Sequence, residues 1–485
     1  MKLKLPNVPT VLGNSNFADV GITGNLTVGN ALTGNLTIDT GATLDTVSGL
    51  NYGITLAGNW ANSGTFTARS NTVTFNGTST GKTINPGASH FYNLVFNGAG
   101  GEWSPLTNTV YVDNDLTMTA GTLNNTAGSA SVQVAGNVAG TAGVINFTNN
   151  TFTQRVAAAK NFGTTSGSTN WTFNNLNFEN SSLGNLTITT ASTATGQIIV
   201  NGTLTIGNAT DTNTTTLDNE TNDRIIAANN VTITSKGSLT ASSTASFTVS
   251  GNWANSGTFT AGTGTVTLIG NASSHQTITT AGQAFYNLTL NNTQATFDQA
   301  IISGALDVNG TLTITDGNLK LDTNNPNVNT AGNVSIASAG AVTKGSGTWT
   351  FDGTTATTYT DSTAAVQNIG VVSINKTDTV APATNNKLTL ASSMTVDTLT
   401  IDGTVGSADT LDLASAGYTL KLANVGATAT VLTVSGTLTP GTSTVKYSAT
   451  NSAGNINVTT TTYNSLQLSG AETYDLTGHL TTTNA

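Results

Sequence analysis

The sequence predicts an all-β protein, a right-handed parallel β-solenoid (β-helix) built from five long repeats of about 80–115 residues, each of several strand-turn coils. Three observations predict this fold: a hexamer that recurs along the chain, a second motif that keeps step with it, and an alternation of apolar and polar residues between turns. Such self-similarity is typical of proteins in which each unit buries its apolar face against the next.

The hexamer begins with an aromatic or apolar residue, followed by two small or polar residues, a branched apolar residue, any residue and a last apolar residue. Its starts lie 82, 112, 84 and 94 residues apart, by subtraction. The five copies are Phe91–Phe96, Phe173–Phe178, Phe285–Leu290, Ile369–Ile374 and Tyr463–Leu468.

A Gly-Asn dipeptide followed by Trp or Val precedes each of the first four hexamers. The third residue of this motif lies 31, 35, 32 and 35 residues before the hexamer start. The copies are Gly58–Trp60, Gly136–Val138, Gly251–Trp253 and Gly332–Val334. Two motifs in step indicate one repeating architecture rather than chance similarity.

Segments such as Thr72–Phe75 and Leu186–Thr189 alternate with period two, which predicts strands with one buried row and one outward Thr row. Gly-containing dipeptides between them predict tight turns. Each long repeat then divides into about four modules of roughly 20–28 residues, the size of one solenoid coil with two or three short strands. Asn at repeated turn positions is expected to form hydrogen-bonded ladders. The alternative is a tandem series of antiparallel β-sandwiches, which would require linkers that the sequence does not show.

Residues 1–22 are not repetitive and are expected to form an N-terminal segment or partial cap. Residues 23–485 are expected to form one continuous solenoid, ending within a repeat without an evident cap. At about 4.8 Å per coil, ~20 coils would make a rod of roughly 100 Å. An uncapped end predicts self-association end to end, or a longer parent chain.

Composition narrows the partners. Charged residues make up 8% of the chain, against roughly 25% in ordinary domains. There are 14 Lys and Arg in 485 residues and no basic stripe, so nucleic acid is not expected as a partner. The sequence contains no apolar run of about 18 residues, so we do not expect membrane insertion. The absence of cysteine excludes a disulfide framework, and Met1–Pro6 does not have the apolar core of a signal peptide.

No residue constellation predicts a catalytic, cofactor-binding or metal site, and we expect no enzyme activity. His90, His275 and His479 do not align between repeats and are expected to be surface turn residues. The one acidic cluster, Asp211–Arg224, is expected to be a solvated loop, with Ca²⁺ binding as the alternative. Carboxylates that could serve a solenoid carbohydrate enzyme occur singly, and they are Asp307, Asp316, Asp322, Asp352, Asp397 and Asp402.

The tryptophans are candidate sugar platforms. Trp60 and Trp253 occupy the motif position at which Val138 and Val334 stand in other copies, which favours a core role. Trp103 follows Gly101 and Glu102 and is expected to be the exposed one.

The segment Gly58–Ala68, identical to 251–261, resembles large bacterial surface proteins built from β-strand repeats and is similar to adhesin and autotransporter-passenger solenoids. The resemblance implies an extracellular or cell-surface location and a structural or adhesive role. Thr23–Val28 and Thr33–Ile38 also resemble repeats of phage tail fibres, which would imply a virion spike released by lysis.

From these observations we expect a non-catalytic extracellular structural or adhesive repeat protein, a rigid rod or filament unit at the cell surface. Surface glycans are candidate ligands. A phage tail fibre or other virion spike is the first alternative. The second alternative is a β-helix carbohydrate-active or glycan-binding protein.

Overall fold

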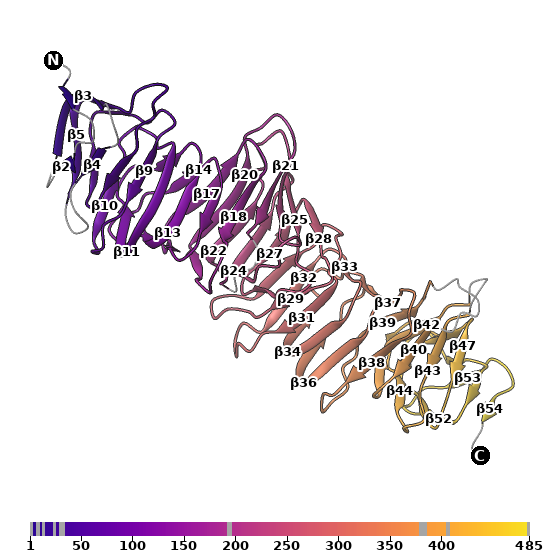
Figure 1. The fold of residues 1–485 in the computed structure, drawn as a ribbon. Helices are drawn as coiled ribbons and strands as arrows, with labels where there is room; N and C mark the ends of the chain where they lie inside the picture. Colours follow the sequence, from indigo (N-terminus) through magenta and orange to yellow (C-terminus); the bar gives the residue numbers. More distant parts are fainter. Residues whose placement is uncertain are drawn as a thin grey trace. The chain divides into compact units, whose positions relative to one another are not determined.

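The computed structural model describes the backbone of residues 3–5, 10–11, 15–22 and 26–28, and all atoms of residues 34–191, 196–377, 386–403 and 408–482. In this part of the chain every regular element is a β-strand and no helix forms. The strands pair in parallel, coil on coil, in a β-solenoid of about 19 turns, which confirms the predicted fold class (Figure 1).

The chain divides into two compact units. The first comprises Met1–Phe247 and Asn255–Gly262, and the second comprises Thr248–Ala254 and Thr263–Ala485. Two strands, β26 (Phe247–Val249) and β27 (Trp253–Asn255), are shared between them.

The first unit contains three stacks of parallel strands, and its longest strands turn a corner and contribute to two stacks. The first stack is β5 (Leu36–Asp45), β7 (Trp60–Asn62), β10 (Lys82–Asn85), β11 (Asn93–Pro105), β13 (Leu116–Asn124), β16 (Val144–Asn146), β19 (Trp171–Phe173), β22 (Ile198–Ile206) and β24 (Ile226–Ile233). The second is β12 (Val110–Val112), β14 (Val132–Val134), β17 (Thr151–Val156) and β20 (Asn175–Asn180), continued by β22 and β24. The third is β6 (Ile54–Leu56), β9 (Thr72–Phe75), β11, β13, β15 (Val138–Gly140), β18 (Lys160–Thr164), β21 (Leu186–Thr190), β23 (Thr215–Asp218), β25 (Gly237–Thr240) and β28 (Thr258–Thr260).

The N-terminal strands follow the same rule. The sequence predicts a non-repetitive segment over residues 1–22, and the described strands there also pair in parallel with later coils. These strands are β1 (Leu3–Leu5), β2 (Thr10–Val11), β3 (Ser15–Ile22) and β4 (Leu26–Val28), and β8 (Thr65–Thr67) pairs with the second half of β5.

The second unit is built in the same way. Its first stack is β29 (Thr265–Leu268), β31 (Asn287–Asn291), β34 (Leu312–Lys320), β36 (Val334–Thr343), β38 (Thr357–Asp361), β40 (Lys387–Leu390), β43 (Thr410–Asp412) and β47 (Thr437–Thr439). The second is β33 (Leu306–Val308), β35 (Val328–Thr330), β37 (Thr348–Phe351), β39 (Val371–Ile374), β42 (Thr398–Ile401) and β46 (Leu432–Val434). One further group consists of β30 (Gln276–Thr279), β32 (Gln299–Ser303) and the second half of β34. Another consists of β41 (Met394–Val396), β44 (Thr419–Leu422), β48 (Thr444–Tyr447) and β52 (Ser465–Leu468). Three small pairs are β45 (Val425–Gly426) with β49 (Thr450–Asn451), β50 (Ile456–Val458) with β53 (Tyr474–Leu476), and β51 (Thr462–Tyr463) with β54 (Thr481–Thr482).

Most strands of the fully described ranges bury alternate side chains inside the coil. In β9, Val73 and Phe75 are buried, whereas Thr72 and Thr74 lie on the outer face. The alternation follows from the period of a strand, which points successive side chains to opposite faces. The predicted inward apolar row and outward Thr row are therefore confirmed, and the predicted core positions of Trp60 and Trp253 are confirmed with them.

The prediction that Trp103 is exposed is wrong. Trp103 is fully buried, and its ring lies 5.7 Å from Phe75 and 5.4 Å from Phe96, measured between centroids. The Lys82 ammonium lies 4.9 Å from the same ring, a cation–π contact. The error has a physical cause: β11 continues through the glycine-rich segment to Pro105, and the strand alternation turns this side chain inward.

The hexamer spans a corner of the coil. In the first copy, the strand pairing that contains Leu94 joins β11 to β9 and β13 in the third stack. In the second copy, Leu176 pairs with Leu204 in the second stack. The same motif therefore turns different corners of the coil, and the smallest structural repeat is the single coil rather than the long sequence period.

The Gly-Asn dipeptide joins each coil to the next. The Asn35 side-chain oxygen accepts a hydrogen bond from the Asn59 amide at 2.7 Å, and the Asn59 side chain accepts one from the Thr83 amide at 2.8 Å. Gly58 leaves room for this contact, because a Cβ there would lie 2.4 Å from the Asn35 oxygen. The predicted asparagine ladder exists, and at these two positions the backbone amide of the next coil donates to the asparagine side chain.

Candidate functional site: a polar groove beside the Asp211–Arg224 segment

The acidic segment Asp211–Arg224 is part of the solenoid, not one solvated loop as the sequence suggested. Its middle forms β23, which pairs with β21 and β25 in the third stack. We call residues 207–214 the first loop and residues 219–225 the second loop. The two loops flank β23, so the longest repeat in the sequence contains an ordinary coil with two enlarged corners.

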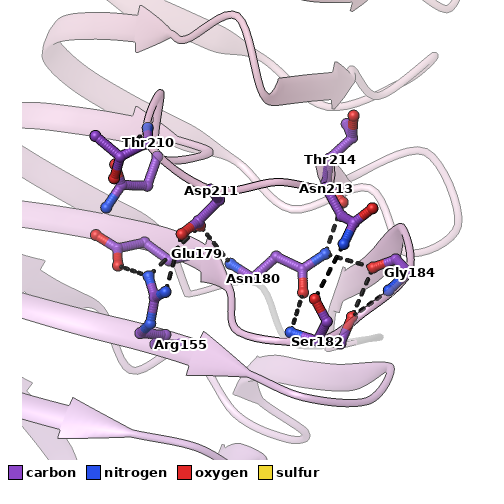
Figure 2. Close-up of polar contacts among 10 residues, drawn as sticks. Arg155, Glu179, Asn180, Ser182, Gly184, Thr210, Asp211, Asn213 and Thr214 are labelled. Carbon is purple, nitrogen blue, oxygen red and sulfur yellow. Dashed lines mark hydrogen bonds and ion pairs between the residues drawn. The ribbon is translucent and has the colours of Figure 1, made fainter.

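An ion-pair cluster holds the first loop (Figure 2). The Arg155 guanidinium contacts Glu179 at 2.6 Å and Asp211 at 2.9 Å. These residues come from β17, from β20 and from the loop after β22, which are successive coils of the second stack. The Asp211 carboxylate also accepts a hydrogen bond from the Asn180 amide at 3.3 Å. One cation thus joins three coils.

Burial and charge act on Arg155 in opposite directions. Burial lowers the pKa of the guanidinium, but the hydrogen bonds and charges of Asp211 and Glu179 outweigh it, so that the pKa is raised above its usual value. The Asp211 side chain is 7% exposed. Because this carboxylate is nearly buried and already pairs with Arg155, it does not provide an open ligand for Ca²⁺.

A tight turn lies next to this cluster (Figure 2). The buried Asn180 carboxamide donates to the carbonyls of Gly184 at 2.7 Å and Thr214 at 3.0 Å, and its oxygen accepts from the Ser182 amide at 2.7 Å. Asn213 donates to the Ser182 carbonyl at 3.0 Å. The turn and the first loop therefore form one hydrogen-bonded body.

The second loop is held from inside the coil. The Asn219 side chain accepts hydrogen bonds from the Arg224 amide at 3.2 Å and from the Thr190 hydroxyl at 2.9 Å. The Arg224 side chain is buried and donates to the Thr164 hydroxyl at 3.1 Å, and burial lowers its pKa. Asn222 donates to the Thr190 carbonyl at 2.5 Å. The sequence predicted a solvated loop here, and that prediction did not include a buried arginine.

A ladder of four polar side chains runs along the corner that precedes the third stack. Asn93 accepts from the Asn114 carboxamide at 2.8 Å and from the Asp115 amide at 3.3 Å. Asp115 Oδ1 accepts from the Asn137 amide at 2.8 Å and from its carboxamide at 3.1 Å. Asn137 in turn accepts from the Asn161 amide at 3.0 Å.

The ladder borders a groove of about 370 Å³. Asp115, Asn137 and Asn161 line it from the ladder, and Thr117, Ala139 and Ala191 line it from the strands of the third stack and the residue after β21. Thr165 and Asn222 complete the lining from the turns after β18 and β23. The second loop therefore forms one wall of the groove. Sequence reasoning missed this site because its residues come from five different coils.

The remaining carboxylates have mostly structural partners. Asp316 and Asp402 accept hydrogen bonds from the next backbone amide, at 2.7 and 2.6 Å. Asp322 pairs with Lys320 at 2.7 Å. Asp397 binds Lys344 and accepts from Asn368 at 2.8 Å.

Asp307 and Asp352, which the sequence shows as isolated, both lie in the second unit, and the charge of Asp307 acts on Asp352. Burial raises the pKa of both, and the charge of Asp307 adds to the shift of Asp352. The buried Lys376 ammonium donates to the Asp352 carbonyl at 2.7 Å, and its amide donates to buried Asp409 at 3.0 Å. Burial, followed by the charge of Asp402, raises the pKa of Asp409 to about 6.

The histidines lie apart from these groups. His90 is exposed and pairs with Asp113 at 2.8 Å, and His275 accepts from the Gln299 amide at 3.3 Å. His479 is exposed. In the described ranges, no group of three or more His, Asp or Glu side chains is placed to hold a metal ion. The described residues also contain no helix long and apolar enough to cross a membrane.

No protein-family model, no curated protein and no solved structure matches this chain. Its function must therefore be argued from the site and the fold.

Proposed function

We propose that the chain is a non-catalytic structural and adhesive module of an extracellular surface, acting as a stalk or filament unit. The observation that supports this proposal is the use of its few charges. A charged cluster, Arg155 with Glu179 and Asp211, connects three successive coils. Charged groups that hold coils together favour a structural role over a reactive one.

The strand pairing favours the same role. Nearly every strand is hydrogen-bonded on both sides to a parallel neighbour, for example β15 between β13 and β18. Before such a coil can be pulled apart or cut by a protease, several backbone hydrogen bonds have to open together. A surface stalk needs this resistance, because it works outside the cell where proteases and shear act on it.

The side chains on the outer face of the coils favour a location outside the cell. Thr, Asn and Ser fill the outward positions, and charged residues make up 8% of the chain. With 14 Lys and Arg in the sequence, there is little charge with which to neutralise a nucleic acid backbone. The resemblance of Gly58–Ala68 to bacterial surface repeats supports the same location.

Electron microscopy of negatively stained protein, combined with light scattering for mass, tests this function. End-to-end filaments of uniform width, or elongated single chains, are the expected results. A discrete trimer would instead favour the phage-fibre alternative. Release of reducing sugars from a panel of polysaccharides would favour the carbohydrate-active alternative and contradict a non-catalytic module.

A further inference from the structure

We propose that the groove beside the second loop binds a neutral oligosaccharide, with Asp115 and Asn161 supplying its main hydrogen bonds. This inference deepens the proposed adhesive function and rests on it. The volume of the groove, about 370 Å³, lies at the lower end of the roughly 300–1,000 Å³ range of small-molecule sites.

The groove contains hydrogen-bonding groups that the ladder leaves available. Asp115 uses Oδ1 in the ladder, and its Oδ2 makes no hydrogen bond to the described residues. The Asn161 side chain is exposed, and only its backbone takes part in the ladder. The Thr117 hydroxyl and the Asn222 side-chain oxygen also make no hydrogen bond to any residue that the structure describes.

These groups match the chemistry of sugar hydroxyls. Neighbouring hydroxyls each donate and accept, so they bind best where acceptors and donors alternate. Asp115 and Asn222 provide acceptors, Asn161 provides both a donor and an acceptor, and Thr117 provides a hydroxyl. Ala139, which is partly exposed, presents a small surface against which a sugar ring can lie without obstruction.

Charge selects a neutral sugar. Asp115 is the one ionisable side chain among the residues that line the groove. The cation of the second loop, Arg224, is buried and donates to Thr164 inside the coil. A phosphate or uronate would therefore meet a carboxylate, with no cation among the residues that line the groove, which disfavours anionic ligands. A peptide fits less well, because the strands of the groove are already paired on both sides and no apolar pocket lines it.

Two substitutions separate binding from folding. Asp115→Asn keeps an oxygen for the ladder and replaces the free carboxylate oxygen, an acceptor, by an amide NH2 group, a donor. Asn161→Ala removes the free carboxamide and leaves the backbone donor of the ladder. Asp39→Asn, an exposed carboxylate on β5 outside the groove, is the matched control. All three variants should show the melting temperature and circular dichroism of the parent protein.

Saturation-transfer difference NMR on the full chain provides the test, with cellotetraose, mannotetraose and chitotetraose as neutral probes and tetragalacturonate as the anionic one. We expect at least one neutral probe to bind. Asp115→Asn and Asn161→Ala should each weaken that binding about tenfold, whereas Asp39→Asn should leave it unchanged.

Three results would overturn the proposal: no binding of any neutral probe, equal binding by the groove variants and the parent, or equally strong binding of tetragalacturonate. The assembly measured by electron microscopy does not depend on the groove. Filaments or stalks without saccharide binding would therefore reject the groove alone, and a compact enzyme-like particle that cleaves polysaccharide would reject the proposed function.

Discussion

At the residue scale, the Gly-Asn dipeptide shows how one coil recognises the next. Asn137 accepts the amide of the following coil, while Gly136 admits the side chain of the preceding one. A Cβ on Gly136 would lie 2.3 Å from the Asn114 carbonyl and 2.4 Å from the Asp115 carboxylate. The pair is therefore required for close stacking of coils and not only for a turn.

Gly136→Ala should destabilise the protein by about 1–3 kcal/mol, because the added methyl group overlaps backbone that cannot move without opening the ladder. Gly184→Ala is the control, since nothing lies within 4 Å of the position of its Cβ. Urea unfolding followed by circular dichroism measures both. Equal midpoints for the two variants would contradict this account of the motif.

Asp409 should make stability depend on pH. Its folded pKa of about 6 lies above its ordinary value of 3.8, so the folded chain binds this proton more tightly than the unfolded chain does. Stability should therefore rise as pH falls through about 6 toward 4, and fall as the pH increases again.

Asp409→Asn should reduce this slope by the contribution of Asp409 and raise the unfolding free energy by on the order of 1–2 kcal/mol at about pH 7.5. The Asn oxygen can still accept from the Lys376 amide, and Lys376 keeps its contact with Asp352. Melting curves recorded between about pH 4 and 7.5 measure the slope. An unchanged slope in the variant would assign the dependence to another group.

At the scale of the element, the segment Asp211–Arg224 shows how an insertion is accommodated. Its centre remains a strand of the stack, and its two loops are anchored by different means. Ion pairs with Arg155 hold the first, and a buried network around Asn219 and Arg224 holds the second. The wall of the groove is therefore part of the rigid coil.

Arg155→Met should loosen the first loop while keeping most of the apolar stem. Glu179 and Asp211 would remain as poorly solvated carboxylates without their cation, at a cost of about 1–3 kcal/mol. Hydrogen exchange should accelerate over residues 207–214 and less over 219–225.

Arg69→Met serves as the comparison for this prediction, because the Arg69–Asp45 pair is largely exposed. It should change neither stability nor exchange measurably. If Arg155→Met behaved in the same way, the cluster would not be the anchor of the loop.

At the scale of the molecule, stability comes from coil-on-coil strand pairing and apolar burial, with few charges. In each unit the strands pair in parallel stacks. In such an array each coil contacts only its neighbours, so local changes should act locally. The long period of the hexamer does not alter this, since its copies turn different corners.

Stability should consequently respond weakly to salt. Raising NaCl from roughly 0.01 M to 1 M shortens the Debye length from about 30 Å to 3 Å and screens exposed ion pairs. We expect the melting temperature to move little, because the described residues contain six Lys or Arg contacts with carboxylates, which are few for a chain of this size. A fall of more than about 5 °C would show that surface charge contributes substantially to stability.

The sequence by itself determined the all-β class, the parallel coils, their size and the inward apolar row, because strand alternation and turn residues act over a few neighbouring positions. It also predicted the asparagine ladder and the buried Trp60. Only the tertiary structure decided that Trp103 is buried, that Arg224 lies inside the coil and that Asp115, Asn161 and Asn222 meet at one groove. Those outcomes depend on which residues of different coils come into register, and that register is set by stacking between segments more than 20 residues apart.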